Sequence, residues 1–168
     1  MNNLSNAFGS LGDYQKQKEL LERALSIQER EYGPEHVEVA HTLTDLGIAF
    51  GDVGDYHKQK ELLERALSIE EREYGPEHVN VATTLGNLGI AFGDLGDYQK
   101  QKELLERALS IKERAYGTEH VAVAVTLSNL GLAYGNHGDY PKQRELLSAR
   151  SRFRSVYTAP SMSPSLQR

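Results

Sequence analysis

The sequence predicts an all-α protein in which antiparallel helix hairpins stack into a solenoid. Three observations predict this fold: one stretch recurs at a fixed period, each copy holds two helical patterns, and the turns between the patterns are short. The stretch covers residues 11–52 and returns at 53–94 and 95–136, each copy beginning 42 residues after the last, and a fourth copy begins at His137. Self-similarity at a period of about 20 to 50 residues is typical of stacked repeat arrays. Helices joined by short turns lie antiparallel to each other.

The first helical pattern of each copy begins after an aspartate and ends at a glycine. Asp13 precedes a run without proline or glycine, which is typical of an N-cap. Gly33 and Pro34 end the run, because glycine accepts the left-handed conformation after a helix and proline cannot continue the helix. The apolar residues recur at helical spacing: Tyr14, Leu20, Leu21, Ala24, Leu25 and Ile27. Glutamates four residues before arginines are expected to form ion pairs within the helix: Glu19 with Arg23, Glu61 with Arg65 and Glu103 with Arg107.

The second helical pattern extends from about His36 to Gly51. One face of this helix is predicted to be buried, because its apolar residues follow a 4-3-4 spacing. Gly47 lies beside that face, and a glycine inside a helix costs about 1 kcal/mol relative to alanine. Its return as Gly89 and Gly131 therefore indicates a close approach to a neighbouring helix. The residues of the buried face are Val39, Leu43, Leu46 and Phe50.

The two ends of the chain depart from the repeat. We expect the array to cover residues 1–155, with a partial first helix at 1–10 and an atypical last helix at 139–155. Residues 156–168 are rich in serine and proline and are expected to be disordered. Charge changes along the array: residues 11–52 carry nine acidic and four basic residues, and residues 137–168 carry two acidic and six basic ones.

Composition excludes several classes of protein. The net charge of −5 is too acidic for a typical nucleic-acid-binding protein. The absence of cysteine excludes disulfides, thiolate zinc sites and cysteine nucleophiles. No apolar run approaches the roughly 20 residues that span a bilayer, and the first ten residues lack the basic and apolar regions of a signal peptide. We therefore expect a cytoplasmic protein that binds neither nucleic acid nor membranes.

The sequence gives no sign of an enzyme. It contains none of the patterns G-x-x-x-x-G-K-[ST], H-E-x-x-H and G-x-S-x-G. His36, His78 and His120 each follow a glutamate, which raises the question of a metal site. These histidines are 42 residues apart and so occupy equivalent corners of successive units, which indicates a structural role in a turn. We expect no catalytic residues, no metal and no cofactor.

The repeat resembles the tetratricopeptide family, and it is most similar to the 42-residue variety found in kinesin light chains and in many scaffold proteins. The resemblance covers roughly residues 1–155 and rests on the segment Tyr74–Ala82 together with Leu88, Gly89, Phe92, Gly96, Asp97, Tyr98, Leu105 and Ala108. It implies a right-handed α–α superhelix that binds protein segments without catalysis. One departure concerns a position where the family usually has alanine: this chain has Gln17, Gln59, Gln101 and Gln143, whose amides must be hydrogen-bonded or reach outward.

The resemblance also implies a concave groove, lined by the helix that carries Val39 and Leu43, that receives a peptide or a partner helix. The residues on the other side of that helix and its equivalents are the candidate groove residues: His41, Thr44, Asp45, Ile48 and Asp52; Thr83, Gly86, Asn87, Ile90 and Asp94; and Val125, Ser128, Asn129, Leu132 and Asn136. This set has no lysine or arginine, so it lacks the basic residues with which tetratricopeptide proteins bind acidic ligands. Its aspartates favour a neutral or basic partner.

The first two units differ at only seven of their 42 positions, and four of the differences fall on this helix away from its buried face. Such variation indicates either ligand specificity or neutral drift at exposed sites, and the sequence does not choose between them. Two further functions stay open: the ligand-sensing portion of a larger signalling ATPase, and a self-assembling structural solenoid. Head-to-tail self-association would bring the acidic first units near the basic last one and cover the apolar ends of the array.

Overall fold

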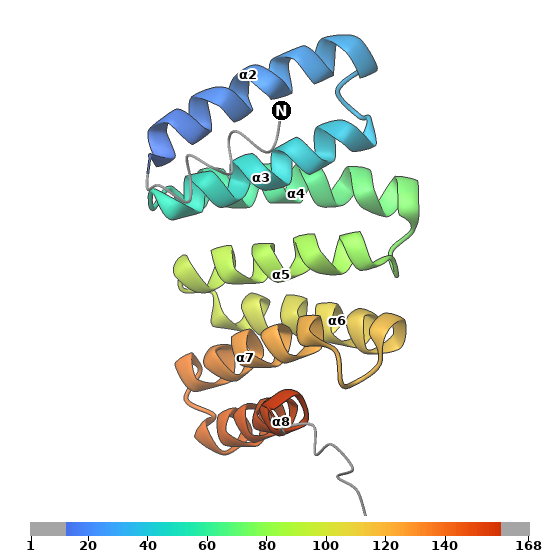
Figure 1. Cartoon of the computed structure of the whole chain (residues 1–168). Helices are drawn as coiled ribbons and strands as arrows, with labels where there is room; N and C mark the ends of the chain where they lie inside the picture. Colours follow the sequence, from blue (N-terminus) through green and yellow to red (C-terminus); the bar gives the residue numbers. More distant parts are fainter. Residues whose placement is uncertain (1–12, 159–168) are drawn as a thin grey trace, which may run out of the picture.

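The computed structural model describes residues 13–158, and Figure 1 shows this part of the chain as a stack of helices that follow one another down the molecule in sequence order. Within this range the chain forms helices only, without a strand, so the predicted all-α hairpin array is confirmed. The helices are α2 (Tyr14–Tyr32), α3 (Val37–Asp52), α4 (Tyr56–Tyr74), α5 (Val79–Asp94), α6 (Tyr98–Tyr116), α7 (Val121–Asn136) and α8 (Tyr140–Thr158).

The two ends of the predicted array are only partly covered. The expected partial helix at residues 1–10 lies outside the described residues. Helix α8 was expected to end near residue 155 and continues to Thr158, and the remainder of the predicted tail, residues 159–168, also lies outside the described range. The boundaries of the array stay a prediction.

Each unit begins and ends its first helix with the same two residues. Asp13 caps α2, because its Oδ1 accepts a hydrogen bond of 3.1 Å from the backbone N–H of Lys16, and Asp55, Asp97 and Asp139 do the same for the later units. Gly33 ends α2 with a φ of 88°, a conformation that glycine adopts without a steric cost.

The histidines that follow these turns are capping residues. His78 Nδ1 accepts a hydrogen bond of 3.2 Å from the N–H of Asn80 at the start of α5, and its ring stacks on Tyr74 with the centroids 4.6 Å apart. His36 and His120 repeat both contacts. The structural role predicted for these histidines is therefore confirmed, although the sequence did not identify it as a helix cap.

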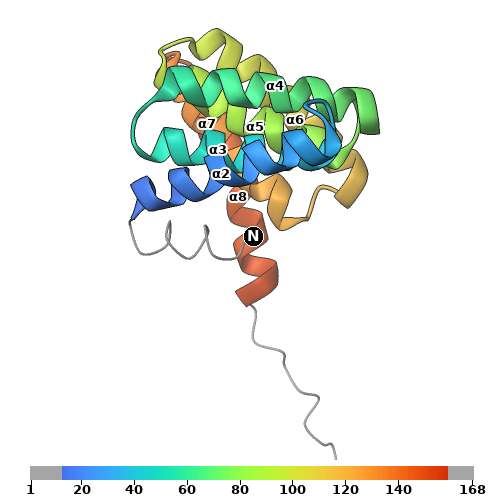
Figure 2. The same cartoon turned by 90° about the horizontal axis from the view of Figure 1, so that it is seen from above.

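Helices α3, α5 and α7 form the inner layer of the array. Each packs between the helices that precede and follow it in the sequence, and α3 with α5 and α5 with α7 also touch directly. Figure 2 gives the view along the stack. The predicted buried face of α3 is confirmed, since none of its four residues is more than 8% exposed: Val39, Leu43, Leu46 and Phe50.

The glycines inside the inner helices allow close packing on the following helix. A Cβ atom at Gly47 would lie 3.1 Å from Cγ of Leu63 on α4, and at Gly89 it would lie 3.0 Å from Cγ of Leu105 on α6. Such distances are tighter than most contacts of Cβ atoms in packed interiors, so the leucine would have to shift by a few tenths of an ångström. The expected close approach is present, and a leucine side chain occupies the space that each glycine leaves.

A second glycine explains the unusual glutamines. Gln17, Gln59 and Gln101 are all buried, and their Oε1 atoms have no hydrogen-bond partner among the described residues. The amide oxygens of these three glutamines therefore lack the hydrogen bond that we expected, and their side chains do not reach outward. The amide of Gln59 fits against α3 because residue 51 is glycine: a Cβ there would lie 2.7 Å from the amide atoms.

The arginines of the first helix in each unit join neighbouring units. Arg65 was expected to pair with Glu61 in its own helix, but its Nη2 lies 2.7 Å from Oε1 of Glu29 and donates to the carbonyl of Pro34 at 2.8 Å. Arg107 makes the equivalent contacts with the preceding unit, to Glu71 and Pro76. The predicted pairs within α4 and α6 are thus wrong. The unit-to-unit acceptors are better placed because they offer a carboxylate and a backbone carbonyl together.

We expect the substitutions Gly51→Ala and Gln59→Ala to be coupled. Gly51→Ala alone should lower the stability, since its Cβ collides with the buried amide of Gln59. In a Gln59→Ala protein the same change should be neutral or stabilising, because alanine is the better helix former by about 0.5–1 kcal/mol. Urea unfolding of the double-mutant cycle measures the coupling, expected to be roughly 1 kcal/mol or more for residues in contact. Gly47→Ala is the control: it meets Leu63, so Gln59→Ala should not rescue it.

Candidate functional site

The candidate groove residues lie on the inner helices α3, α5 and α7. Most of them are exposed or half-buried, and only Gly86 is buried. Large apolar side chains are among the exposed ones: Ile48 and Ile90 are each 37% exposed, and Leu132 is 55% exposed. These three occupy equivalent positions in successive units, so they form a line of exposed apolar side chains along the inner layer.

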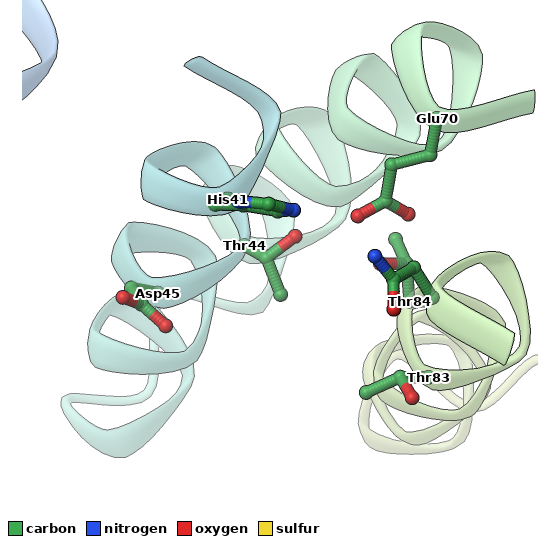
Figure 3. Close-up of a pocket in the computed structure, with 7 residues that line it drawn as sticks. His41, Thr44, Asp45, Glu70, Thr83 and Thr84 are labelled. Carbon is green, nitrogen blue, oxygen red and sulfur yellow. The ribbon is translucent and has the colours of Figure 1, made fainter. Parts of the chain in front are cut away.

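One pocket, of about 290 Å³, brings part of the candidate set together between the first two units. It contains His41, Thr44 and Asp45 from α3 and Thr83 from α5, all predicted from the sequence, and Figure 3 shows them around a shared space. The other candidate residues lie on the same helices outside this pocket. The pocket is completed by three residues that the sequence analysis did not select: Glu70, Asn80 and Thr84.

Glu70, from the end of α4, is the most unusual residue in the pocket. The side chain is only 2% exposed and its Oε2 has no hydrogen-bond partner among the described residues. Figure 3 shows its carboxylate directed between α3 and α5, towards His41 and Thr84. Burial raises the pKa of the Glu70 carboxyl, while a hydrogen bond from Thr84 and the nearby imidazoles act in the opposite direction. One oxygen of the Glu70 carboxylate, Oε2, is therefore an acceptor without a donor.

Two further groups in the pocket share this poorly solvated environment. Thr44 Oγ1 is buried and has no hydrogen-bond partner in the described part of the chain. Burial raises the pKa of Asp45, and the charge of His41 lowers it to a smaller extent. Figure 3 places Asp45 on the next turn of α3, farther from Glu70 than Thr44 is.

The residue equivalent to Glu70 differs in every unit. It is Gln28 on α2 and Lys112 on α6. Lys112 Nζ donates a hydrogen bond of 3.1 Å to Thr126 Oγ1 on α7, and burial lowers the pKa of the Lys112 ammonium. The inner layer is therefore acidic where α3 meets α5 and basic where α5 meets α7.

A signal for these missed residues was present in the sequence. Each of the seven residues that line the pocket has a counterpart 42 residues away, in the other one of the first two units. The residue type is the same in both units only for Thr84. The first two units also differ where Gln28 corresponds to Glu70 and where Glu38 corresponds to Asn80. These differences thus belong to the same site as those at His41, Thr44 and Asp45. Sequence reasoning missed Glu70 because it treated the glutamates of that helix as a solvated face.

The pocket can bind groups by hydrogen bonds and charge, and its residues do not form a metal site. No group of three or more histidine, aspartate or glutamate side chains in residues 13–158 is arranged to hold a metal ion.

Comparison with known proteins identifies the repeat. A model of the tetratricopeptide repeat matches residues 1–69, 52–113 and 95–148, and these matches together cover most of the chain. The chain belongs to the tetratricopeptide repeat family. No curated protein matches it significantly in sequence.

Solved structures of tetratricopeptide proteins have the same arrangement of helices. The crystal structure of BtubC (BKLC) from P. vanneervenii is similar with a TM-score of 0.84 and 24% identity, over 98% of this chain and 65% of that one. A putative kinesin light chain with nearly identical repeats from Podosopora anserina has a TM-score of 0.82 and 26% identity, over 96% of this chain and 76% of that one. The apo form of RapI has a TM-score of 0.79 and 21% identity, over 92% of this chain and 54% of that one.

These neighbours confirm the right-handed superhelix of hairpins and the likeness to kinesin light chains that the sequence indicated. The chain spans about 65% of the length of BtubC. Among the described residues, none of the helices is both long enough and apolar enough to cross a membrane.

We expect Glu70→Gln to stabilise the protein at neutral pH. Burial raises the pKa of Glu70 in the folded state, so the folded protein keeps the proton of this carboxyl at pH values where the unfolded chain has lost it. The stability of the fold therefore decreases as the pH rises above the ordinary value of 4.5. Removing the charge should raise the free energy of unfolding at pH 7 by about 1 kcal/mol, because a charged buried acceptor without a partner costs more than a neutral one; Gln28 Oε1, at the equivalent position of the first unit, is also buried without a partner among the described residues. Gln28 shows that the position accepts an amide.

The measurement is urea unfolding at pH 7 and at pH 4. The gain from Glu70→Gln should shrink at pH 4, where the carboxyl is protonated in both states. Glu73→Gln, an exposed position on the same helix, is the control and should change little at either pH. A gain from Glu70→Gln that is the same at both pH values would contradict the assigned cause.

Proposed function

We propose that the protein is a non-enzymatic interaction scaffold that binds an extended segment of a partner protein along the inner helices α3, α5 and α7. The observation that supports this proposal is the line of exposed apolar side chains at equivalent positions, Ile48, Ile90 and Leu132. Exposed apolar groups in a row are a common feature of protein-binding surfaces. The core stripe of the same helices is already buried, so this line is not needed for folding.

Polar side chains lie one helical turn before each of these apolar residues. Asn87 precedes Ile90 and Asn129 precedes Leu132, and both amides are half-buried. An asparagine amide offers donors and an acceptor at once, which suits the alternating N–H and C=O groups of an extended backbone. The apolar residues would supply contact area for partner side chains, and the asparagines would orient the partner's backbone.

The charges of this surface favour a basic or neutral segment over the first two units. Asp45, Asp52 and Asp94 are the charges of the candidate set, and the structure adds Glu70. Lys112 changes this preference beyond α5, where the surface would accept a neutral or acidic group. A cytoplasmic location, as in many scaffolds of this family, is part of the same proposal.

The two alternative functions stay predictions. The chain spans only part of the length of BtubC and RapI, and this is compatible with a sensing role within a larger protein. It is equally compatible with a separate scaffold, so it does not favour the alternative. The pocket described above favours recognition of a ligand over a purely structural array.

We expect Ile90→Asp to weaken partner binding without unfolding the protein. The side chain is 37% exposed, so a charge there remains in contact with water. A peptide-array screen on the native protein would supply ligands, and fluorescence anisotropy would give their affinities. Loss of a central apolar contact typically costs about 1–2 kcal/mol, or roughly tenfold in affinity.

Ser68→Asp is the matched control, because it adds the same charge at an exposed position on α4, outside the inner layer. It should leave the affinity within about twofold, while circular dichroism should show equal helix content in both variants. Equal affinities for Ile90→Asp and Ser68→Asp would show that the binding surface lies elsewhere.

Head-to-tail self-association also stays a prediction, drawn from the acidic first units and the basic last one. Light scattering over a range of protein and salt concentrations tests it. The average mass should rise with protein concentration and fall with added salt, because salt screens the attraction between oppositely charged ends. A mass that stays at one protomer at low salt and high concentration would exclude it.

A further inference from the structure

The pocket between α3 and α5 has a chemistry that selects one kind of side chain. We propose that it receives an arginine side chain of the bound partner segment, and that Glu70 pairs with the guanidinium. This inference rests on the proposed binding role of the inner helices and names the residue that fixes the partner's register.

The first argument is the hydrogen bonding that the pocket leaves incomplete. Glu70 Oε2 and Thr44 Oγ1 are both buried, both line the pocket, and neither has a partner among the described residues. A buried polar atom without a partner costs about 1–3 kcal/mol. The Glu70 side chain is 2% exposed, so bulk water does not satisfy it directly. A ligand that donates hydrogen bonds to both atoms would remove this cost.

The second argument is charge. The lining contains two carboxylates, Asp45 and Glu70, and no lysine or arginine. His41 is the one other titratable group that lines it. A cation therefore fits the pocket and an anion does not, since a buried carboxylate next to a second anion is strongly unfavourable.

The third argument distinguishes arginine from lysine. A guanidinium presents five N–H donors in a rigid plane and is more weakly hydrated than an ammonium group. The acceptors of this pocket are spread over two helices, Thr44 on α3 and Glu70 at the end of α4. A planar group with donors on several sides can reach both, whereas an ammonium group is a compact point charge. The pocket volume of about 290 Å³ accommodates the end of such a side chain.

The adjacent unit makes the site unique. At the position equivalent to Glu70, Lys112 donates to Thr126 on α7. A second arginine of the partner is therefore repelled one unit farther along. A partner aligned one unit out of register would place its cation against this lysine, so Glu70 and Lys112 together define a single register.

The experiment uses two kinds of probe with the intact chain. The first is Nα-acetyl-arginine amide, compared with the citrulline and lysine analogues, followed by NMR chemical shifts of backbone amides. The arginine probe should perturb residues near Thr44, Glu70 and Thr84 in a saturable manner. The citrulline probe, which has the same shape without the charge, and the lysine probe should bind at least about tenfold more weakly, as expected when a charged hydrogen bond is lost.

The second probe is a peptide that has been selected for binding to the inner helices α3, α5 and α7. It is synthesised with either arginine or citrulline at each basic position. One position should lose at least about tenfold in affinity on the change to citrulline, and Glu70→Gln should abolish that difference. Glu73→Gln, on the same helix but exposed, should preserve it. Because Gln28 occupies the equivalent position in the first unit, Glu70→Gln should fold, and circular dichroism checks this.

The outcomes separate this inference from the proposed function. Peptides that bind the inner face without any preference for arginine over citrulline would overturn the inference and leave the scaffold role intact. Failure of every peptide to bind would overturn the scaffold role. An arginine probe that perturbs no residue of the pocket, or one that binds equally well to Glu70→Gln, would overturn the assignment of Glu70 directly.

Discussion

Close packing of each inner helix on the helix that follows it is the constraint on which the array depends. Gly47, Gly89 and Gly131 permit it, because each leaves room for a leucine of the next helix. A second glycine near the end of the inner helix makes similar room for a buried glutamine amide, as Gly51 does for Gln59. With these contacts repeated in every unit, a strict period of 42 residues is required. An inserted residue would move a side chain into the space that a glycine must leave.

This constraint explains why the proposed binding surface can vary while the units remain nearly identical. The packing of an inner helix is determined by residues such as Val39, Leu43 and Gly47 on one side. Residues such as His41, Thr44 and Asp45 lie on the other side and take no part in that packing. They can therefore change from unit to unit at little cost in stability. The changes extend to Glu70 on the neighbouring helix because its side chain reaches the same pocket.

Most of the fold could be predicted from the sequence, because local signals and the repeat agree. Asp13 and Gly33 mark the helix ends correctly, and the spacing of Val39, Leu43, Leu46 and Phe50 identifies the buried face. The site was predicted only in part. Arg65 and Glu70 were assigned from their positions on one helix, whereas their contacts depend on how successive units are placed. That placement depends on three-dimensional packing, which helical periodicity within a single unit does not contain.

The arginine contacts between units have a consequence for how the array comes apart. Arg65 and Arg107 each hold the turn of the preceding unit through a carboxylate and a backbone carbonyl. In the fourth unit the residue equivalent to Arg65 and Arg107 is Ala149, which has no guanidinium group. In the turn of the third unit, Thr118 stands at the position equivalent to Pro34 and Pro76. The α6–α7 hairpin and α8 are therefore joined by apolar packing without this polar contact. A pulling force applied along the stack would therefore separate α8 before the units that the arginines join.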